Sequence, residues 1–110
     1  MPEVNNDIRL SGIQRLSLRL MLMMAQRGIE RTPNTDLFKM VEKNRSTSTY
    51  ASNFRKSCHS LVDNGFLNLH RHPKTLKMSF SLTPLGLLTA ADLEEEAQEQ
   101  AKKEEEQDAQ

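Results

Sequence analysis

The segment that decides the fold is residues 61–86, LVDNGFLNLHRHPKTLKMSFSLTPLG. Its hydrophobic pattern changes at Gly65, from helical spacing before the glycine to short apolar runs after it. Residues 66–69 predict one short strand, and residues 78–82, where apolar residues alternate with serines, predict a second. The basic stretch 70–77 between them contains a proline and predicts the tip of a β-hairpin.

A helix is predicted after this hairpin. Thr83 is a typical N-cap and Pro84 a typical first helical residue. The apolar stripe of this helix consists of Leu85, Leu88, Ala91 and Leu93 and then ends. Residues 94–110 are almost all Glu, Gln, Lys and Ala, which predicts either an exposed helical extension or a disordered end.

Three helices are predicted before the hairpin. In chain order they span about 11–27, 36–43 and 47–64, with a turn at 31–36 between the first two. Ser11 is the expected N-cap of the first helix and Gly28 the residue that ends it. Asn34 or Thr35 would cap the second helix. All four residues 46–49 are competent caps for the third, so its start stays open.

The helical spacing also predicts which faces are buried. In the third helix the apolar stripe consists of Tyr50, Ala51, Phe54, Cys58 and Leu61. The first helix has two apolar faces, one of Ile13, Leu16, Leu20, Met23 and Met24 and one of Leu18, Met21 and Leu22. The second of these faces is either core or the seam of a dimer, and the stripe of the last helix is the other candidate seam.

Residues 61–86 resemble the wing region of MarR-like and PadR-like transcriptional regulators. Those families place a leucine four residues before a glycine, as Leu61 and Gly65 here, and end the second wing strand in LTPxG, as in residues 82–86. The resemblance is good over about 50–90 and holds in outline over 11–49. It implies a winged helix-turn-helix that binds DNA. The wing reads HRHPKT instead of the usual Asp and Arg combination, and no second N-terminal helix is expected for the usual MarR dimer core. The resemblance therefore does not extend to MarR-type ligand sensing.

The expected fold class is therefore mainly α with a small β-hairpin, a winged helix-turn-helix plus a C-terminal helix. A chain of 110 residues is the size of one domain. We expect an N-terminal tail at 1–10, the winged helix-turn-helix at 11–82, and the C-terminal helix at 83–110 with an acidic end.

Charge is distributed unevenly along the chain. Residues 1–82 carry 13 Lys+Arg and 6 Asp+Glu, whereas residues 83–110 carry 2 and 9, so the net charges are +7 and −7. A basic body with an acidic tail is common in nucleic-acid-binding proteins, although solvated helical tails are often acidic as well. The tail also offers a surface for a protein partner.

The polar side of the third helix and the hairpin tip form the predicted DNA site. Short hydroxyls and an amide reach base edges or phosphates, and cations bind phosphates. The predicted DNA-binding residues are Arg45, Ser48, Thr49, Ser52, Asn53, Arg55, Lys56, Arg71, His72, Lys74 and Lys77. The plain alternatives are a solvated helix face and a basic hairpin that only blocks edge pairing.

These patterns predict a sequence-specific double-stranded DNA-binding protein, a homodimeric transcriptional regulator of bacterial, phage or plasmid type. The third helix would enter the major groove and the wing, residues 70–77, would lie on the backbone. The rival interpretation is a winged-helix protein–protein interaction module, or a replication or partition accessory protein.

Enzymatic and metal-dependent functions are not predicted. The four glycines are isolated, and neither G-x-S-x-G nor H-E-x-x-H occurs, so we expect no enzyme and no cofactor. Cys58, His59, His70 and His72 match no standard zinc spacing. A single cysteine in an apolar stripe indicates a buried thiol in a reducing compartment. With no signal peptide or membrane span expected, this favours the cytoplasm.

Overall fold

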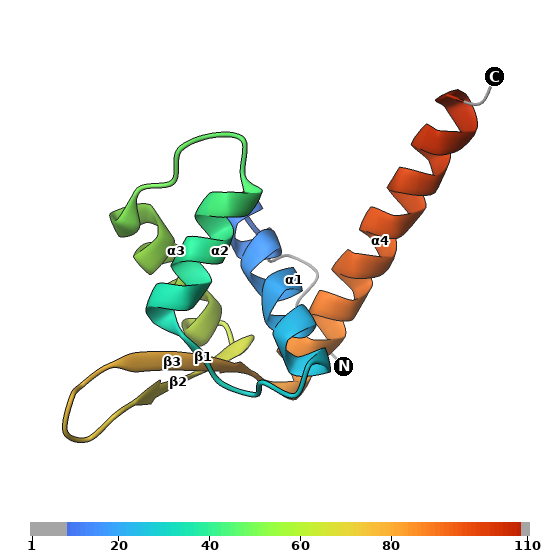
Figure 1. Ribbon diagram of the computed structural model, residues 1–110. Coiled ribbons are helices and arrows are strands. Elements are labelled where there is room, and N and C mark those ends of the chain that lie inside the picture. Colours follow the sequence, from blue (N-terminus) through green and yellow to red (C-terminus); the bar gives the residue numbers. More distant parts are fainter. Residues whose placement is uncertain (1–8, 109–110) are drawn as a thin grey trace.

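The computed structural model describes residues 9–108, with side-chain burial described for residues 9–103. The predicted tail 1–10 therefore lies mostly outside the described residues. The elements in chain order are α1 (Gly12–Gln26), β1 (Thr32–Pro33), α2 (Asn34–Asn44), α3 (Ala51–Asp63), β2 (Leu67–Arg71), β3 (Met78–Leu82) and α4 (Pro84–Asp108). Four helices and a small antiparallel sheet form a winged helix, as predicted (Figure 1).

The sheet has three strands in the order β1-β3-β2, where two had been predicted. In the hairpin, Leu67 lies opposite Leu82 and Arg71 opposite Met78. Strand β1 pairs with the other side of β3, where Thr32 lies opposite Phe80. The prediction of a simple turn at 31–36 is thus wrong. Two residues are too few to show the alternation by which strands are recognised.

Of the three helix starts predicted before the hairpin, two are wrong. The start of α1 is as expected, because the Ser11 side chain accepts a hydrogen bond from the Gln14 backbone N–H and the Gln14 side chain accepts one from the Ser11 backbone N–H. Helix α2 begins directly after Pro33, and α3 begins after Tyr50; neither has a side-chain cap. The expected start of the third helix near residue 47 is therefore four residues too early.

The core lies between α1, α2, α3 and the inner face of the sheet. Its largest fully buried side chains include Leu18, Met21, Leu37, Val41, Leu61 and Leu67. The rings of Phe38 and Phe54 lie 5.1 Å apart and join α2 to α3. Because Leu18, Met21 and Leu22 belong to this core, a dimer seam on that face of α1 is ruled out.

The LTPLG motif fixes where α4 leaves the sheet. The Thr83 N–H donates to the Phe66 carbonyl at 3.2 Å, and the Gly86 N–H donates to Thr83 Oγ1 at 2.9 Å, so Thr83 caps α4 as predicted. The Thr83 hydroxyl also donates to the Gly65 carbonyl. A Cβ at Gly86 would collide with the Phe66 carbonyl oxygen. Only glycine allows the helix to pass this close to the strand.

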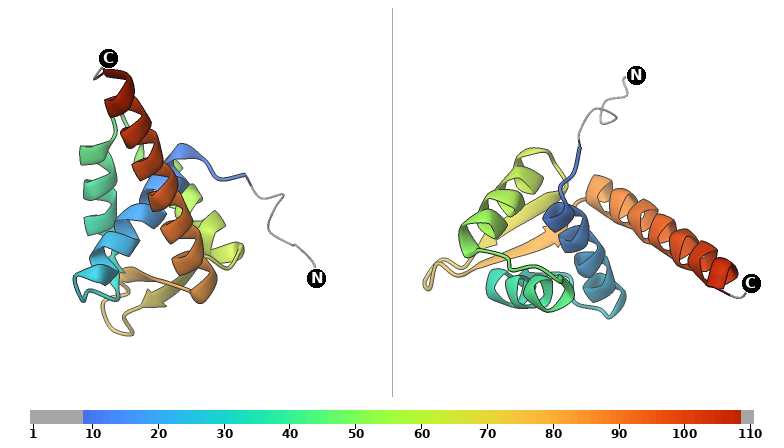
Figure 2. Two further views of the ribbon diagram at one scale, coloured as in Figure 1. Left: turned by 90° about the vertical axis from the view of Figure 1, so that its right-hand side faces the viewer. Right: turned by 90° about the horizontal axis from the view of Figure 1, so that it is seen from above.

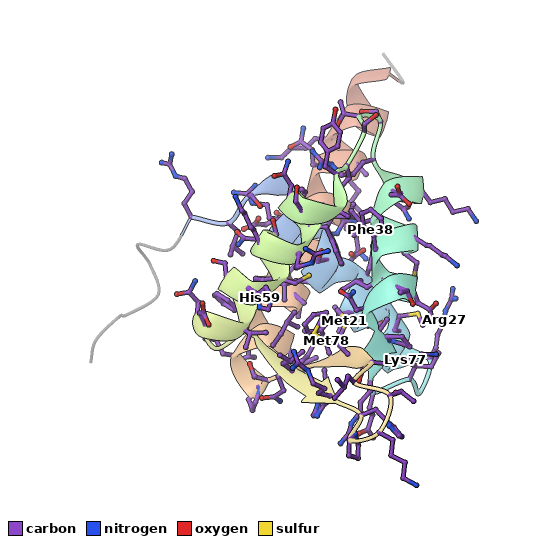
Figure 3. The ribbon with its side chains drawn as sticks, turned by 90° about the vertical axis from the view of Figure 1, so that its left-hand side faces the viewer. Met21, Arg27, Phe38, His59, Lys77 and Met78 are labelled. Carbon is purple, nitrogen blue, oxygen red and sulfur yellow. The ribbon has the colours of Figure 1, made fainter. Side chains whose placement is uncertain are left out.

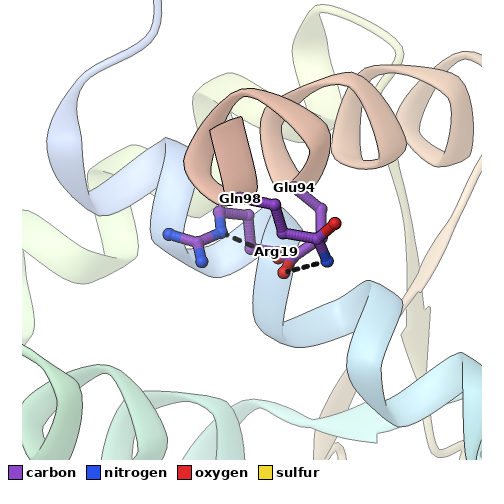
Figure 4. Close-up of polar contacts among 3 residues, drawn as sticks. All are labelled: Arg19, Glu94 and Gln98. Carbon is purple, nitrogen blue, oxygen red and sulfur yellow. Dashed lines mark hydrogen bonds and ion pairs between the residues drawn. The ribbon is translucent and has the colours of Figure 1, made fainter. Parts of the chain in front are cut away.

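Helix α4 packs on α1 and then extends beyond it (Figure 2). Ala90 is fully buried and Leu93 is half-buried, whereas Leu88 and Ala91 of the predicted stripe are exposed. Arg19 Nε lies 3.0 Å from Glu94 Oε1, and Gln98 donates to the other Glu94 oxygen (Figure 4). From residue 99 to residue 103 every side chain is exposed.

The projection of α4 explains the shape of the molecule. Its radius of gyration is 15.1 Å, whereas a compact chain of this length is expected to have about 13 Å. The acidic end is thus a helical extension, exposed over the residues 99–103 for which burial is described, which is one of the two predicted alternatives. Within residues 9–108, no helix has both the length and the apolar character that crossing a membrane requires.

Candidate nucleic-acid interface

Helix α3 buries one side and exposes a polar, basic side. Phe54, Cys58 and Leu61 face the core, as predicted. Burial raises the pKa of the Cys58 thiol to about 12, so the thiol is neutral and unreactive at ordinary pH. The exposed residues of α3 include Ser52, Asn53, Arg55, Lys56 and His59, and Figure 3 shows His59 on this outer side.

The loop before α3 differs from the prediction at two residues. Thr49 is only 8% exposed, and its hydroxyl accepts a hydrogen bond from the Arg45 guanidinium at 3.2 Å. Its predicted place on the exposed face is wrong, and its contact instead holds Arg45 against the loop. Tyr50, expected in the core, is 70% exposed at the N-cap of α3. Ser48 is exposed, as predicted.

The tip of the wing is fixed by hydrogen bonds within the hairpin. The His72 N–H donates to the Lys77 carbonyl, and the Leu76 N–H donates to the His72 carbonyl, both at 2.9 Å. His72 Nδ1 accepts from the backbone N–H groups of Lys74 and Thr75 at 3.2 Å. One side of the His72 ring is therefore occupied by the wing itself. The exposed basic residues of the wing are Arg71, His72, Lys74 and Lys77.

A hollow of about 300 Å³ lies between β1 and the wing, and several basic side chains are part of its lining. Arg31, the residue before β1, lines it together with Arg71 and Lys77 of the hairpin. Among the described residues that line it there is no acid. Sequence reasoning missed Arg31, because the segment was expected to be a turn and not to join the sheet. The only signal was a cation immediately before a β-branched residue and a proline.

The outer side of α3 and the wing lie on the same side of the molecule, and α4 leaves on the other (Figures 1 and 3). From Arg45 to Ala91 the sequence contains one acid, Asp63, against six Lys/Arg and all three histidines. We call this surface the basic face. We define it as the polar and basic residues of α3, of the wing and of the segments that precede α3 and β1, of which Arg45 is half-buried and the others are exposed: Arg31, Arg45, Ser48, Ser52, Asn53, Arg55, Lys56, His59, Arg71, His72, Lys74 and Lys77. Its chemistry suits a polyanion.

The acids and histidines on the described part of the chain do not gather into a metal centre. No three His, Cys, Asp or Glu side chains among them lie close enough to hold one ion. Cys58 is buried, His59 is on the opposite side of α3, and His70 Nε2 lies 2.8 Å from Ser81 Oγ.

This combination of three helices, a basic wing and a capping C-terminal helix defines a winged-helix protein. Among solved structures, a single-site mutant of ZitR from Lactococcus lactis matches with a TM-score of 0.71 and 13% identity. AdcR from Streptococcus pyogenes matches at 0.65 and 20%, and F-93 from SSV1 at 0.59 and 16%. These likenesses confirm the fold expected from residues 61–86.

The matches differ in how much of each neighbour they cover. The match with ZitR covers 96% of this chain and 65% of the ZitR chain. The match with AdcR covers 91% of this chain and 66% of the AdcR chain, and the match with F-93 covers 88% of this chain and 96% of the F-93 chain. The chain thus spans about two thirds of the ZitR and AdcR chains and almost the whole of F-93. No family model matches the sequence, and a comparison with curated proteins found no significant match.

Proposed function

We propose that this chain is a non-enzymatic, sequence-specific double-stranded DNA-binding protein that regulates transcription in the cytoplasm. The observation that carries the proposal is the basic face, in which the outer side of α3 and the wing present cations in the same direction. The neighbours support it, since one is named a competence repressor and ZitR is described as a zinc-responsive MarR family member.

In this proposal α3 enters the major groove by its N-terminal half. Ser52, Asn53 and Lys56 face base edges there, and Arg55 binds phosphate. Arg45, held by Thr49, and Ser48 bind the backbone beside the helix. The wing residues Arg71, His72, Lys74 and Lys77, together with Arg31, follow the backbone on the other side.

We further propose that the protein acts as a homodimer. Two copies would place their α3 helices about 34 Å apart, one turn of DNA, and would favour an inverted-repeat site. The exposed side chains of Leu87 and Leu88 are the apolar surface of α4 that a second copy would cover. This surface belongs to the last helix, whose apolar stripe is the second of the two dimer seams considered from the sequence.

Binding to a mixed-sequence duplex, followed by fluorescence anisotropy at increasing salt, tests the proposal. Affinity should fall steeply with salt, because each phosphate contact releases counterions. Lys56→Glu combined with Lys74→Glu should abolish binding. Lys102→Glu combined with Lys103→Glu is the matched control, since it makes the same charge change on the exposed part of α4 and should reduce affinity far less.

Tyr50 provides a second readout of the same complex. It is the only tyrosine in a chain without tryptophan, and it stands exposed at the start of α3. Its fluorescence should therefore change when DNA covers that end of the helix. If neither the full chain nor a chain ending at Gln98 is retained on duplex DNA at low salt, the proposal is wrong.

If the protein does not bind duplex DNA, the second candidate function is favoured, a winged-helix interaction module or a replication or partition accessory protein. The observation behind it is α4, whose acidic end is an exposed helix clear of the body and available to a protein partner (Figure 1). Retention of the full chain, and not of the chain ending at Gln98, by a basic partner protein would support it.

A further inference from the structure

Leu76 stands out on the wing because it is both exposed and strained. Its side chain is 62% exposed at the hairpin tip. Its φ is +61°, and within residues 9–108 no other non-glycine residue has a positive φ. A Cβ makes this left-handed conformation unfavourable, which is why glycine and asparagine are the usual occupants of such turns. Neither the backbone conformation nor burial in the core therefore accounts for a leucine at this position.

The tip holds Leu76 in place, so its exposure is not that of a loose loop. The Leu76 N–H is bonded to the His72 carbonyl, and the His72 ring accepts from two backbone N–H groups of the same turn. Thr75 Oγ1 accepts from the Lys77 N–H at 3.3 Å. These bonds fix the turn and project an apolar side chain between the exposed Lys74 and Lys77.

We propose that Leu76 is an apolar wedge that enters the minor groove and partly unstacks a base step, while the flanking lysines bind the adjacent phosphates. This inference rests on the proposed DNA-binding function. Minor-groove proteins use leucine and similar side chains in this way and kink the duplex. The wedge should favour flexible pyrimidine–purine steps such as TA, so it adds sequence preference where no base edge is read.

A single exposed leucine is ordinary on a protein surface. Leu76 differs from Leu88, which is equally exposed at 66% but lies on a regular helix without backbone strain. The wing that carries it lies on the same side of the molecule as α3 (Figure 1), and its neighbours in the chain include Lys74 and Lys77, cations that a polyanion would neutralise. The rigid turn means that no ordering of the tip is needed when it meets DNA.

The test uses an A·T-rich duplex with 2-aminopurine in its TA steps, since 2-aminopurine brightens when it is unstacked. Wild-type protein at saturation should raise the fluorescence. L76N should fold at least as stably, because asparagine tolerates φ near +61° better than leucine. It should nevertheless bind about tenfold more weakly, as expected when one leucine-sized apolar contact is lost, and give no fluorescence rise.

Two further variants separate polarity from backbone strain. L76M and L76Q have unbranched side chains of similar size on the same backbone, so they share any cost of the positive φ. The proposal predicts a fluorescence rise with L76M and none with L76Q. Lys56→Ala serves as the affinity control: it should weaken binding but preserve the rise at saturation, because Lys56 lies on α3 and not on the wing.

The outcomes distinguish the wedge from the proposed function. If wild-type protein binds the duplex without a fluorescence rise, or if L76Q behaves like L76M, the wedge is wrong and DNA binding stands. If wild-type protein does not bind duplex DNA in a salt-dependent way, both are wrong. A rise with wild type, L76M and Lys56→Ala, and none with L76N or L76Q, supports both.

Discussion

Gly86 is the residue whose identity the structure explains most directly. In sequence it is one letter of LTPLG, a motif that predicts a helix start without saying why its last residue is glycine. In the structure it faces the carbonyl of Phe66, at a distance that leaves no room for a side chain. The occurrence of Gly65 together with LTPLG therefore has two physical causes. One is this close approach of Gly86, and the other is that Thr83 forms hydrogen bonds with the backbone of both Gly65 and Phe66.

Gly86→Ala should destabilise the protein by about 2–3 kcal/mol, since the added methyl group displaces α4 or β2 from its packed position. Gly12→Ala is the matched control, because no atom lies within 4 Å of the place that its added methyl group would take at the start of α1. It should keep or slightly raise stability. Urea unfolding followed by circular dichroism measures both, and equal midpoints for the two variants would contradict the steric explanation.

Cys58 gives a pH-dependent prediction. The ordinary pKa of the thiol is near 9.0, and burial raises it to about 12 in the folded protein. Below pH 9 the thiol is protonated in both states and contributes no pH dependence. Above pH 9 the unfolded thiol ionises and the folded one does not, so stability should fall as pH rises, by up to about 1.4 kcal/mol per pH unit.

The Cys58→Ala variant should not show this part of the loss of stability above pH 9, whatever its free energy of unfolding at lower pH. Every other titratable group is present in both proteins, so the difference between the two slopes isolates the thiol. Urea unfolding at a series of pH values from about 8 to about 11 provides the slopes. Parallel curves for wild type and variant would show that the thiol ionises freely in the folded state.

At the residue scale, periodicity alone misplaced Tyr50 and Thr49. Tyr50 lies four residues before Phe54, so helical spacing put it in the core stripe. That spacing applies only inside the helix, and α3 begins one residue later. Thr49 was assigned to the polar face for the same reason, whereas it is buried in the loop against Arg45. Residues 46–49 all resemble caps, and the sequence offered no means of choosing among them.

At the scale of elements, the hairpin and α4 were predictable because their signals are local. Gly65, the alternating residues 78–82 and the Thr83–Pro84 pair each act within a few positions. Strand β1 and the packing of α4 were not, because both depend on partners far away in the chain. Strand β1 exists through its pairing with β3, and the inner side of α4 is defined by α1.

Helix α4 should consist of a structural half and a dispensable half. A chain ending at Gln98 keeps Ala90, Leu93 and Glu94, so its free energy of unfolding should change by less than about 1 kcal/mol. A chain ending at Thr83 loses all of α4, which covers one side of α1, and should not unfold cooperatively. Thermal denaturation of the two truncated proteins measures this difference.

The contact between α1 and α4 should depend on packing more than on its ion pair. The Arg19 and Glu94 side chains are 38% and 37% exposed, and ion pairs at such positions contribute about 0–1 kcal/mol. Glu94→Gln in the full chain should therefore leave the thermal midpoint nearly unchanged. A large loss with this variant would assign the contact to electrostatics.

For the whole molecule, the separation of charge matters more than the net charge of zero. The body carries the basic face, and the acidic residues after Gln98 lie on the end of α4 that projects from the body. A duplex bound at the basic face still experiences this negative charge at low salt, because screening is weak at distances of tens of ångströms when the ionic strength is about 0.01 M. The tail should therefore oppose binding that relies on charge alone.

Removing residues 99–110 should strengthen binding to a mixed-sequence duplex at low ionic strength, and the gain should disappear at about 0.15 M salt, where charges are screened within roughly 8 Å. A full-length variant with Glu99, Glu104, Glu105 and Glu106 changed to glutamine separates charge from length. It should reproduce the gain if repulsion is the cause. Anisotropy titrations at both salt concentrations measure it. A gain that persists at the higher concentration would mean that the tail covers the basic face directly and does not act through its field.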